Sequence, residues 1–216
     1  MNCSKEDIKN TAPWVALKQL NSYNPPELDL STKIVEPTFF NRPTLEAAEL
    51  TLGMWLCREY PDGSISRHKI TEVEAYDGPE DKACHAHKGL TPRTEIMFGP
   101  SGYWYVYLCY GVHWMLNIVT GPVDYPAAIL IRGTEDLVGP GRLTKALQIN
   151  KNFNKSPIEK PTKLWLEHNL TSSNYDFKII QTPRIGIDYA GPIWSQKPYR
   201  FLLLNYSKND YYVKES

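Results

Sequence analysis

The sequence lacks the features that would point to a membrane, a redox site or a zinc ribbon. Its four cysteines are scattered and form no Cys-x-x-Cys pair, which argues against a ribbon and indicates a reducing compartment. No apolar run approaches the roughly 20 residues that cross a bilayer. The charged first residues do not resemble a signal peptide. We therefore expect an intracellular protein without a membrane partner.

Net charge is absent as well, since 24 basic residues balance 24 acidic ones. A basic surplus normally supplies the attraction to phosphate, so any nucleic-acid surface must be assembled by folding. The charges are unevenly spread, because residues 151–216 carry 10 lysines and arginines against 6 acidic residues. We expect binding to any nucleic acid to be weak or salt-sensitive.

The length of 216 residues suits a single domain with a hydrophobic core. Residues 1–36 are polar and contain three prolines, so we expect an N-terminal arm, partly ordered or disordered, before a domain at 37–216. Hydrophobic periodicity and turn residues predict the elements of that domain. They are a helix after Pro43, strands at 64–76, 103–110, 114–119, 127–132, 185–187 and 199–205, a loop at 77–102, a short helix after Gly139, and mixed helix and loop at 151–180.

Short turns join several of the predicted strands. Strands joined in this way pair antiparallel, and the predicted helices must then pack around the sheet. We therefore expect an α+β fold in a single domain, with a curved, mainly antiparallel β-sheet core, surrounding helices and a protruding β-hairpin.

The predicted strand that ends at Tyr76 carries two carboxylates. Side chains alternate along a strand, so every second residue shares a face. The residues expected on one face are Ile70, Glu72, Glu74 and Tyr76. This pattern fits a solvated sheet edge, and it fits equally a carboxylate placed to take a proton from water.

The segment at 84–87 reads Cys-His-Ala-His, and zinc prefers these ligand types. The sequence offers no second cluster at a suitable spacing, and the other histidines are isolated. We therefore expect no metal, and a histidine here that hydrogen bonds or stacks on a ring.

One predicted strand is unusually aromatic. Alternation places Trp104, Val106 and Leu108 on a plausible core face, which leaves Tyr107 on the opposite face. A buried strand explains only the first of these faces. Tyr110 falls at the hairpin turn, where a bulky ring can act as a wedge in a stack of bases.

Three further polar positions each allow two explanations. Asn117 lies inside an apolar strand, where it either bonds nearby backbone or recognises a base edge. Arg132 ends a strand and is either a surface charge or a group that orients a carboxylate or contacts phosphate. The segment from Gly139 to Arg142 places free N–H groups and a cation at a helix N-terminus, which is a weak signal for an anion site.

Taken together, these segments resemble the alkyladenine (3-methyladenine) DNA glycosylase family of purine DNA glycosylases. The resemblance covers roughly residues 37–203. The matching stretches are E-V-E-A-Y-D-G-P-E-D at 72–81, His85, T-P-R at 91–93, M-F at 97–98, Y-V-Y-L-C-Y-G at 105–111, N-I at 117–118, L-I-R at 130–132, G-P at 139–140, A-L-Q-I-N at 146–150, P-R-I-G-I at 183–187 and K-P-Y-R-F at 197–201.

The resemblance implies a hydrolase of base excision repair. Such an enzyme flips a damaged purine (3-methyladenine, 7-methylguanine, hypoxanthine or ethenoadenine) from double-stranded DNA and cuts its N-glycosidic bond. Glu74 would deprotonate the attacking water, and Arg132 and the backbone carbonyl of Ile185 would hold that water. No lysine falls on the catalytic motif positions, so we expect a monofunctional enzyme that hydrolyses the bond without a Schiff base. We also expect a monomer without a cofactor, located in a bacterial cytoplasm (nucleoid) or, if eukaryotic, a nucleus.

The resemblance also implies how the DNA is held. The flipped base would lie between Tyr76 and His85 on one side and Tyr107 on the other. Asn117 would disfavour guanine, and Tyr110 would intercalate. The residues expected to contact the DNA backbone are Thr91, Arg93, Gly139, Arg142 and Lys145.

Two other functions remain open at this point. The first is a two-carboxylate glycoside hydrolase that uses Glu72 and Glu74, although two positions so near on one strand suit neither of the usual carboxylate separations. The second is a nucleic-acid-binding module without catalysis, in which Glu74 is structural.

Overall fold

The structure is a computed structural model that describes residues 33–169 and 176–206. Most of the predicted arm therefore lies outside the described residues. Its last residues pack on the domain, because Val35 is fully buried and Ile34 forms a β-bridge with Glu167. The domain boundary at residue 36 stays a prediction.

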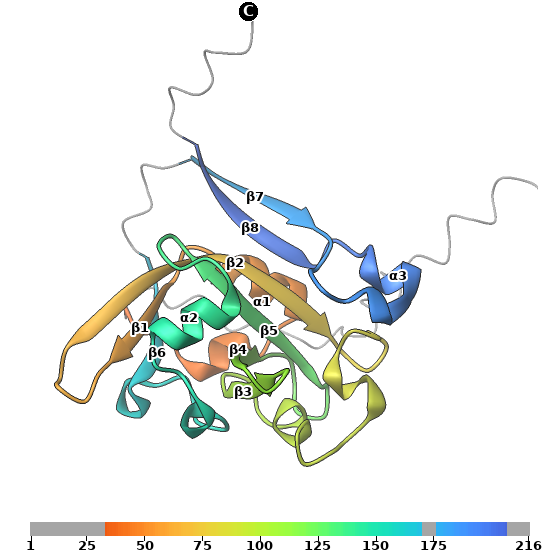
Figure 1. Ribbon diagram of the computed structural model, residues 1–216, viewed down its shortest axis with the longest axis horizontal. Helices are drawn as coiled ribbons and strands as arrows, with labels where there is room; N and C mark the ends of the chain where they lie inside the picture. Colours follow the sequence, from red (N-terminus) through yellow and green to blue (C-terminus); the bar gives the residue numbers. More distant parts are fainter. Residues whose placement is uncertain (1–32, 170–175, 207–216) are drawn as a thin grey trace, which may run out of the picture.

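The described residues form one eight-stranded sheet with short helices around it (Figure 1). The strands are β1 (Trp55–Glu59), β2 (Ile65–Asp77), β3 (Trp104–Cys109), β4 (His113–Val119), β5 (Ala127–Thr134), β6 (Leu164–Glu167), β7 (Asp176–Thr182) and β8 (Arg200–Tyr206). The sheet runs β3-β4-β5-β2-β1-β6, and β8 pairs with both β2 and β7. Its pairings are antiparallel throughout, which confirms the predicted α+β fold.

The helices of the described residues are short. They are α1 (Thr44–Thr51), α2 (Pro140–Ala146) and α3 (Gly191–Ser195), with 3₁₀ turns η2 (Pro37–Phe40), η3 (His85–Lys88), η4 (Glu95–Phe98), η5 (Lys151–Phe153), η6 (Lys160–Thr162) and η8 (Asp188–Ala190). α1 packs against β2 and β5, and α2 packs against β4 and β5. Both helices begin directly after the residues predicted to start them, Pro43 and Gly139. None of these helices is long and apolar enough to span a bilayer.

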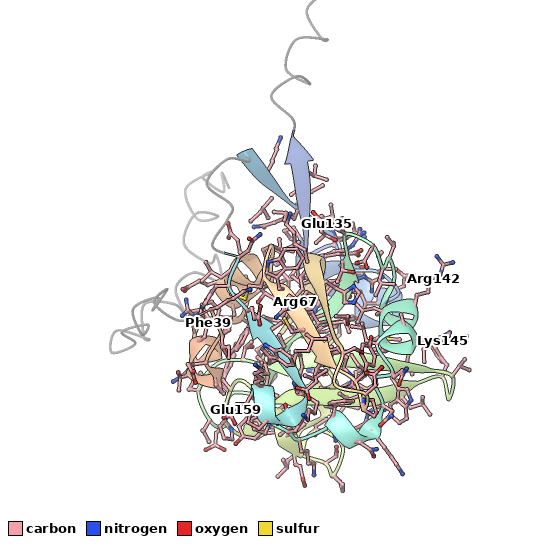
Figure 2. The ribbon with its side chains drawn as sticks, turned by 90° about the vertical axis from the view of Figure 1, so that its left-hand side faces the viewer. Phe39, Arg67, Glu135, Arg142, Lys145 and Glu159 are labelled. Carbon is pink, nitrogen blue, oxygen red and sulfur yellow. The ribbon has the colours of Figure 1, made fainter. Side chains whose placement is uncertain are left out.

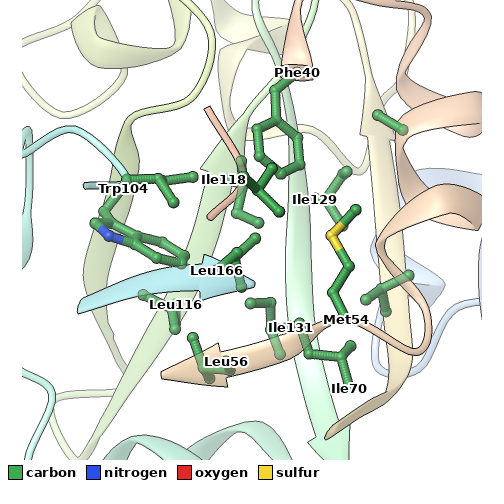
Figure 3. Close-up of a cluster of buried hydrophobic side chains, with 14 of the residues drawn as sticks. Phe40, Met54, Leu56, Ile70, Trp104, Leu116, Ile118, Ile129, Ile131 and Leu166 are labelled. Atoms are coloured by element: carbon green, nitrogen blue, oxygen red, sulfur yellow. The ribbon is translucent and has the colours of Figure 1, made fainter. Parts of the chain in front are cut away.

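The largest buried cluster joins residues from the sheet, both longer helices and the segment before α1 (Figure 3). Trp104 lies fully buried in it, and its Nε1 donates a hydrogen bond to the Leu164 carbonyl at 3.0 Å. Trp104 and Val106 confirm the predicted core face of the aromatic strand. The prediction is wrong for Leu108, which is 41% exposed because it lies near the hairpin tip, beyond the covered part of the sheet.

The predicted face of β2 needs a correction at Ile70. Ile70 is fully buried and shares the core with Val73 and Ala75, so it does not lie on the face of Glu74. The pairing of β2 with β5 is irregular on both sides of Glu72. An extra residue at such a bulge reverses which side chains share a face.

Two other predictions of strands need correction. The segment at 185–187 is not a strand, because the Ile185 N–H bonds a carboxylate and Gly186 turns the chain at φ +75°. Conversely, the region predicted as mixed helix and loop contains β6 and the start of β7, and β1 was not predicted.

Replacing Leu116 by Ala is expected to lower the free energy of unfolding by about 2–5 kcal/mol, because the side chain is fully buried and leaves a cavity. Leu90→Ala is the matched control, since Leu90 is 67% exposed and its loss changes stability by no more than about 0.5 kcal/mol. Chemical denaturation of both variants measures the difference. Equal effects would contradict the assigned core.

Candidate active site

Glu74 is a carboxylate with no exposed surface, in the part of β2 that is paired on both sides with β5 and β8. Burying a charged group is costly unless hydrogen bonds replace the lost water. The Tyr76 hydroxyl donates to Oε2 at 2.9 Å, and the Ile185 backbone N–H donates to Oε1 at 2.7 Å. Arg132 Nη1 also donates to Oε2, at 3.2 Å. Both carboxylate oxygens are therefore held in fixed directions.

Arg132 connects Glu74 to Glu72. Its Nε donates to Glu72 Oε1 at 2.8 Å, and Arg200 of β8 donates to the same oxygen at 2.7 Å. Burial pulls the pKa of Arg132 down, but the attraction of Glu74 and Glu72 outweighs it and raises the pKa overall. Of the explanations open for Arg132, the structure therefore favours a group that orients carboxylates.

Tyr76 presents its hydroxyl to Glu74 as a donor. Burial, followed by the nearby Glu74 carboxylate, raises the pKa of Tyr76 well above its usual value, so the phenol keeps its proton. The Arg184 guanidinium lies over the Tyr76 ring, 4.7 Å from its centroid. One face of the ring is thus covered by a cation, which fixes the plane of the ring.

Next to Tyr76 lies a hollow of about 330 Å³, part of it open to solvent, which we term the aromatic hollow. Its lining residues are Tyr76, Ala83, His85, Met97, Tyr105, Tyr107, Asn117, Ala128 and Tyr189. Glu74 is not one of its lining residues, but it accepts a hydrogen bond from one of them, Tyr76. The structure thus brings together the predicted base-binding residues, and their arrangement around a base stays a prediction.

His85 packs edge-on against the Tyr107 ring, with 4.6 Å between the ring centroids. Its Nδ1 forms a hydrogen bond with the Tyr105 hydroxyl at 2.9 Å. Burial, and then the positive charge of Arg93, lowers the pKa of His85 to about 4. The imidazole is therefore uncharged at neutral pH and does not repel a cation in the aromatic hollow.

Of the two explanations open for Asn117, the structure shows the hydrogen bonds to nearby backbone. Its side chain is 3% exposed, and its Nδ2 donates to the backbone carbonyls of Tyr105 at 3.0 Å and Met115 at 3.4 Å. It also lines the aromatic hollow. These bonds fix the direction of the amide, and a role in rejecting guanine stays a prediction.

Tyr110 stands at the tip of the β3–β4 hairpin with 93% of its surface exposed. Both it and Gly111 have positive φ, 49° and 69°, and Val112 N bonds the Cys109 carbonyl across the turn. Positive φ is costly for a bulky residue and often marks a functional position. The turn presents the ring to solvent, as a wedge would need, and intercalation itself stays a prediction.

The predicted DNA-contacting residues of α2 lie beside this hairpin. Gly139 precedes the helix at φ 97°, and Arg142 and Lys145 are exposed. Figure 2 shows both side chains projecting away from the domain. A Cβ at Gly141 would lie 2.8 Å from the His113 ring, so glycine allows α2 to approach the hairpin next to its turn. Contact of these residues with DNA stays a prediction.

The two residues predicted to contact DNA from the loop before η4, Thr91 and Arg93, have different surroundings. The Thr91 hydroxyl is bonded to Thr94 Oγ1 at 2.9 Å and so helps to build the loop. Arg93 is exposed, and its guanidinium lies 4.7 Å from the centroid of the Tyr107 ring. Arg93 therefore lies near the aromatic hollow.

The side chains that suggested a metal site point to different partners. Cys84 Sγ lies 3.8 Å from the Pro126 carbonyl, and His87 Nδ1 lies 2.6 Å from the Pro79 carbonyl. His85 bonds a tyrosine, as described above. The cysteine and the two histidines therefore do not converge on one point.

Sequence reasoning missed several residues of the site. Tyr105 shares the strand face of Tyr107, so alternation could have found it. Asp81 and Arg184 fall within the stretches that carry the resemblance, but no role was assigned to them. Tyr189 lines the aromatic hollow from η8, and no signal in the sequence indicated it.

Replacing His85 by Gln is expected to make the free energy of unfolding fall less steeply as the pH is lowered. The pKa of His85 is about 4 in the folded protein and 6.5 in its ordinary state, so between these values the unfolded chain binds more protons. Stability therefore falls as the pH drops from 6.5 towards 4. Denaturation of wild type and variant on either side of pH 6.5 measures the effect. His87→Gln, at an exposed site, should retain the wild-type slope, and the same slope in His85→Gln would contradict the buried, neutral imidazole.

Comparison with known proteins matches the chain to the family described as methylpurine-DNA glycosylase, over residues 38–138 and 135–207. A relative from Psychrobacter cryohalolentis is 40% identical over 204 residues, covering 77% of this chain and 94% of the relative. A relative from Methanocella arvoryzae is 40% identical and covers 79% of this chain and 90% of its own length. A third, from Legionella pneumophila strain Paris, is 39% identical and covers 85% and 99%. All three carry the provisional name 3-methyladenine DNA glycosylase.

The matched segments contain β2 with Glu74, the aromatic hairpin and the segment of Arg184. They therefore include the elements from which the site is built, and they confirm the resemblance seen in the sequence. The chain belongs to the methylpurine-DNA glycosylase family.

Proposed function

We propose that this protein is a monofunctional DNA glycosylase of base excision repair. It flips a damaged purine out of double-stranded DNA into the aromatic hollow and hydrolyses the N-glycosidic bond. The observation that carries the proposal is the buried Glu74 carboxylate, oriented by Arg132, Tyr76 and the Ile185 N–H beside that hollow. Family membership supports the same class of reaction.

In this reaction Glu74 accepts a proton from water while the water oxygen bonds to C1′ of the deoxyribose. The bond from C1′ to the base nitrogen breaks, and its electron pair leaves with the base. A cationic alkylated purine then leaves as a neutral molecule, whereas hypoxanthine or ethenoadenine must also take up a proton. Arg132 and the backbone at Ile185 align the carboxylate and the water. Among the described residues, the donors that reach Glu74 are a phenol, a guanidinium and a peptide N–H, and none of them is an amine that could form a Schiff base.

The aromatic hollow accounts for the choice of base. Extruding a base costs a few kcal/mol and costs least for a lesion that pairs badly. Stacking returns roughly 1–3 kcal/mol per base. Purines alkylated at a ring nitrogen are cationic, and the electron-rich faces of Tyr76 and Tyr107 favour a cation. The neutral His85 does not oppose it. This attraction favours the cationic 3-methyladenine and 7-methylguanine nucleotides, whereas neutral hypoxanthine and ethenoadenine gain only the stacking. We propose all four purines as the substrate class.

The glycoside hydrolase alternative has less support. It needs two carboxylates that are free to act as acid and base or as nucleophile. Glu72 is bonded to both Arg132 and Arg200 through one oxygen, which suits an orienting role. An experiment distinguishes the other alternative, a nucleic-acid-binding module without catalysis, from a glycosylase.

Glu74→Gln is expected to abolish release of free base while duplex binding is retained. The amide keeps the shape of the side chain but cannot accept the proton, and loss of a general base costs about 100-fold or more. The measurement is release of hypoxanthine and ethenoadenine from duplex DNA, with binding measured in parallel. Glu159→Gln, at an exposed site on the surface of Figure 2, is the matched control and should keep full activity. Base release by Glu74→Gln at the wild-type rate would remove Glu74 as the general base. Duplex binding without any base release by the wild-type protein would support the non-catalytic module.

Tyr110→Ser is expected to weaken binding to a lesion-containing duplex more than it slows cleavage of a base already extruded. The ring supplies the contact that fills the vacated stack, and such stacking is worth about 1–3 kcal/mol. Binding and single-turnover rates on a matched duplex and on single-stranded DNA separate the two effects. Val123→Ser, which is also exposed but lies in another loop, should change neither. Equal losses in binding and cleavage for Tyr110→Ser would remove the wedge.

A further inference from the structure

A second charged pair lies close to Glu74 and has no role in the reaction as proposed so far. Asp81 and Arg184 form a two-point ion pair, with Nη1 at 2.5 Å from Oδ2 and Nη2 at 2.8 Å from Oδ1. Neither side chain has exposed surface. A buried ion pair is by itself weak support for stability, because desolvation offsets the attraction. Arg184 Nε is moreover buried without a partner among the described residues. The pair is therefore not optimised for stability.

Asp81 fixes the loop that leads into the aromatic hollow. Its Oδ2 accepts from the Asp77 N–H at 3.1 Å, and its Oδ1 accepts from the Ala83 N–H at 3.0 Å. Ala83 and His85, two and four residues beyond Asp81, both line the hollow. The wall of the hollow thus depends on where the Asp81 carboxylate is held.

Arg184 fixes the opposite side of the same region. Its Nη1 also donates to the Ala75 carbonyl of β2 at 2.8 Å, and its guanidinium covers the Tyr76 ring. The next residue, Ile185, donates its N–H to Glu74. The chain then turns away at Gly186. One guanidinium therefore determines both the plane of Tyr76 and the position of a donor to Glu74.

We propose that the Asp81–Arg184 pair is the positioning element of the reaction. It holds the Ile185 N–H against the Glu74 carboxylate. It also fixes the Tyr76 ring and the hollow-lining residues Ala83 and His85 in position relative to that carboxylate. Neither residue touches the base or the water, so both act through their neighbours. The inference rests on the proposed function of Glu74. A misplacement of about 1 Å at a reacting group can cost about 100-fold in rate, so loosening this pair should slow the chemical step.

The test uses the full chain with Arg184→Lys and Asp81→Asn. Lysine keeps the charge but loses the two-point geometry, and asparagine keeps the shape but loses the charge. Arg58→Lys is the matched control. Arg58 is 7% exposed and bonds the Leu147 carbonyl at 3.0 Å, but it lies in β1, which pairs with the first half of β2, away from Glu74.

Two quantities are measured below the melting temperature of every variant. One is the single-turnover rate of ethenoadenine release at saturating enzyme, per folded protein. The other is duplex binding, followed by the fluorescence of ethenoadenine. We expect the rate to fall about 100-fold in Arg184→Lys and in Asp81→Asn, with a smaller change in binding, and the double variant to lose no more than either single one. Arg58→Lys should keep the wild-type rate.

The possible outcomes are distinct. Wild-type rates in Arg184→Lys and Asp81→Asn, with lowered melting temperatures, would overturn the positioning role and leave the pair structural. A loss confined to binding would overturn the link to Glu74. A wild-type protein that releases no base would overturn the proposed function, and this inference with it. If Asp81→Asn does not fold, the comparison of Arg184→Lys with Arg58→Lys decides.

Discussion

A carboxylate without exposed surface needs donors on both oxygens, and Glu74 receives them from three separated parts of the chain. Tyr76 comes from the same strand, Arg132 from β5, and the Ile185 N–H from a loop 111 residues away. Removing any one donor leaves a buried acceptor less satisfied. Strand pairing serves the site as much as the fold, because pairing of β2 with β5 brings Arg132 to Glu74 and pairing with β8 brings Arg200 to Glu72.

Local patterns predicted the parts of the fold that local rules govern. The alternation that buries Trp104 and Val106, the hairpin turn at Tyr110 and the helix after Pro43 follow from periodicity and turn chemistry. The irregular pairing at Glu72 could not be predicted, because one extra residue in a strand leaves no signal in its composition. The strand predicted at 185–187 failed because its N–H bonds a side chain, whereas a period of two describes bonding to another strand.

The same distinction holds for the site. Glu74, Tyr76, Tyr107 and Asn117 stood out because a polar or aromatic group in an apolar strand needs an explanation. Asp81 and Arg184 did not stand out, since a single acid and a single base in loops are ordinary surface residues in most sequences. The role that we propose for them depends on a contact between residues 103 positions apart in the chain. Only the folded structure shows that both are buried.

The order of these contacts along the chain has a consequence for synthesis. Arg184, Ile185 and Arg200 leave the ribosome long after β2, yet they bond Asp81, Glu74 and Glu72. A nascent chain that ends before them carries carboxylates without their partners, and folding of β2 into its final surroundings must wait for β8. A prematurely terminated product that lacks these residues therefore cannot assemble the site around Glu74.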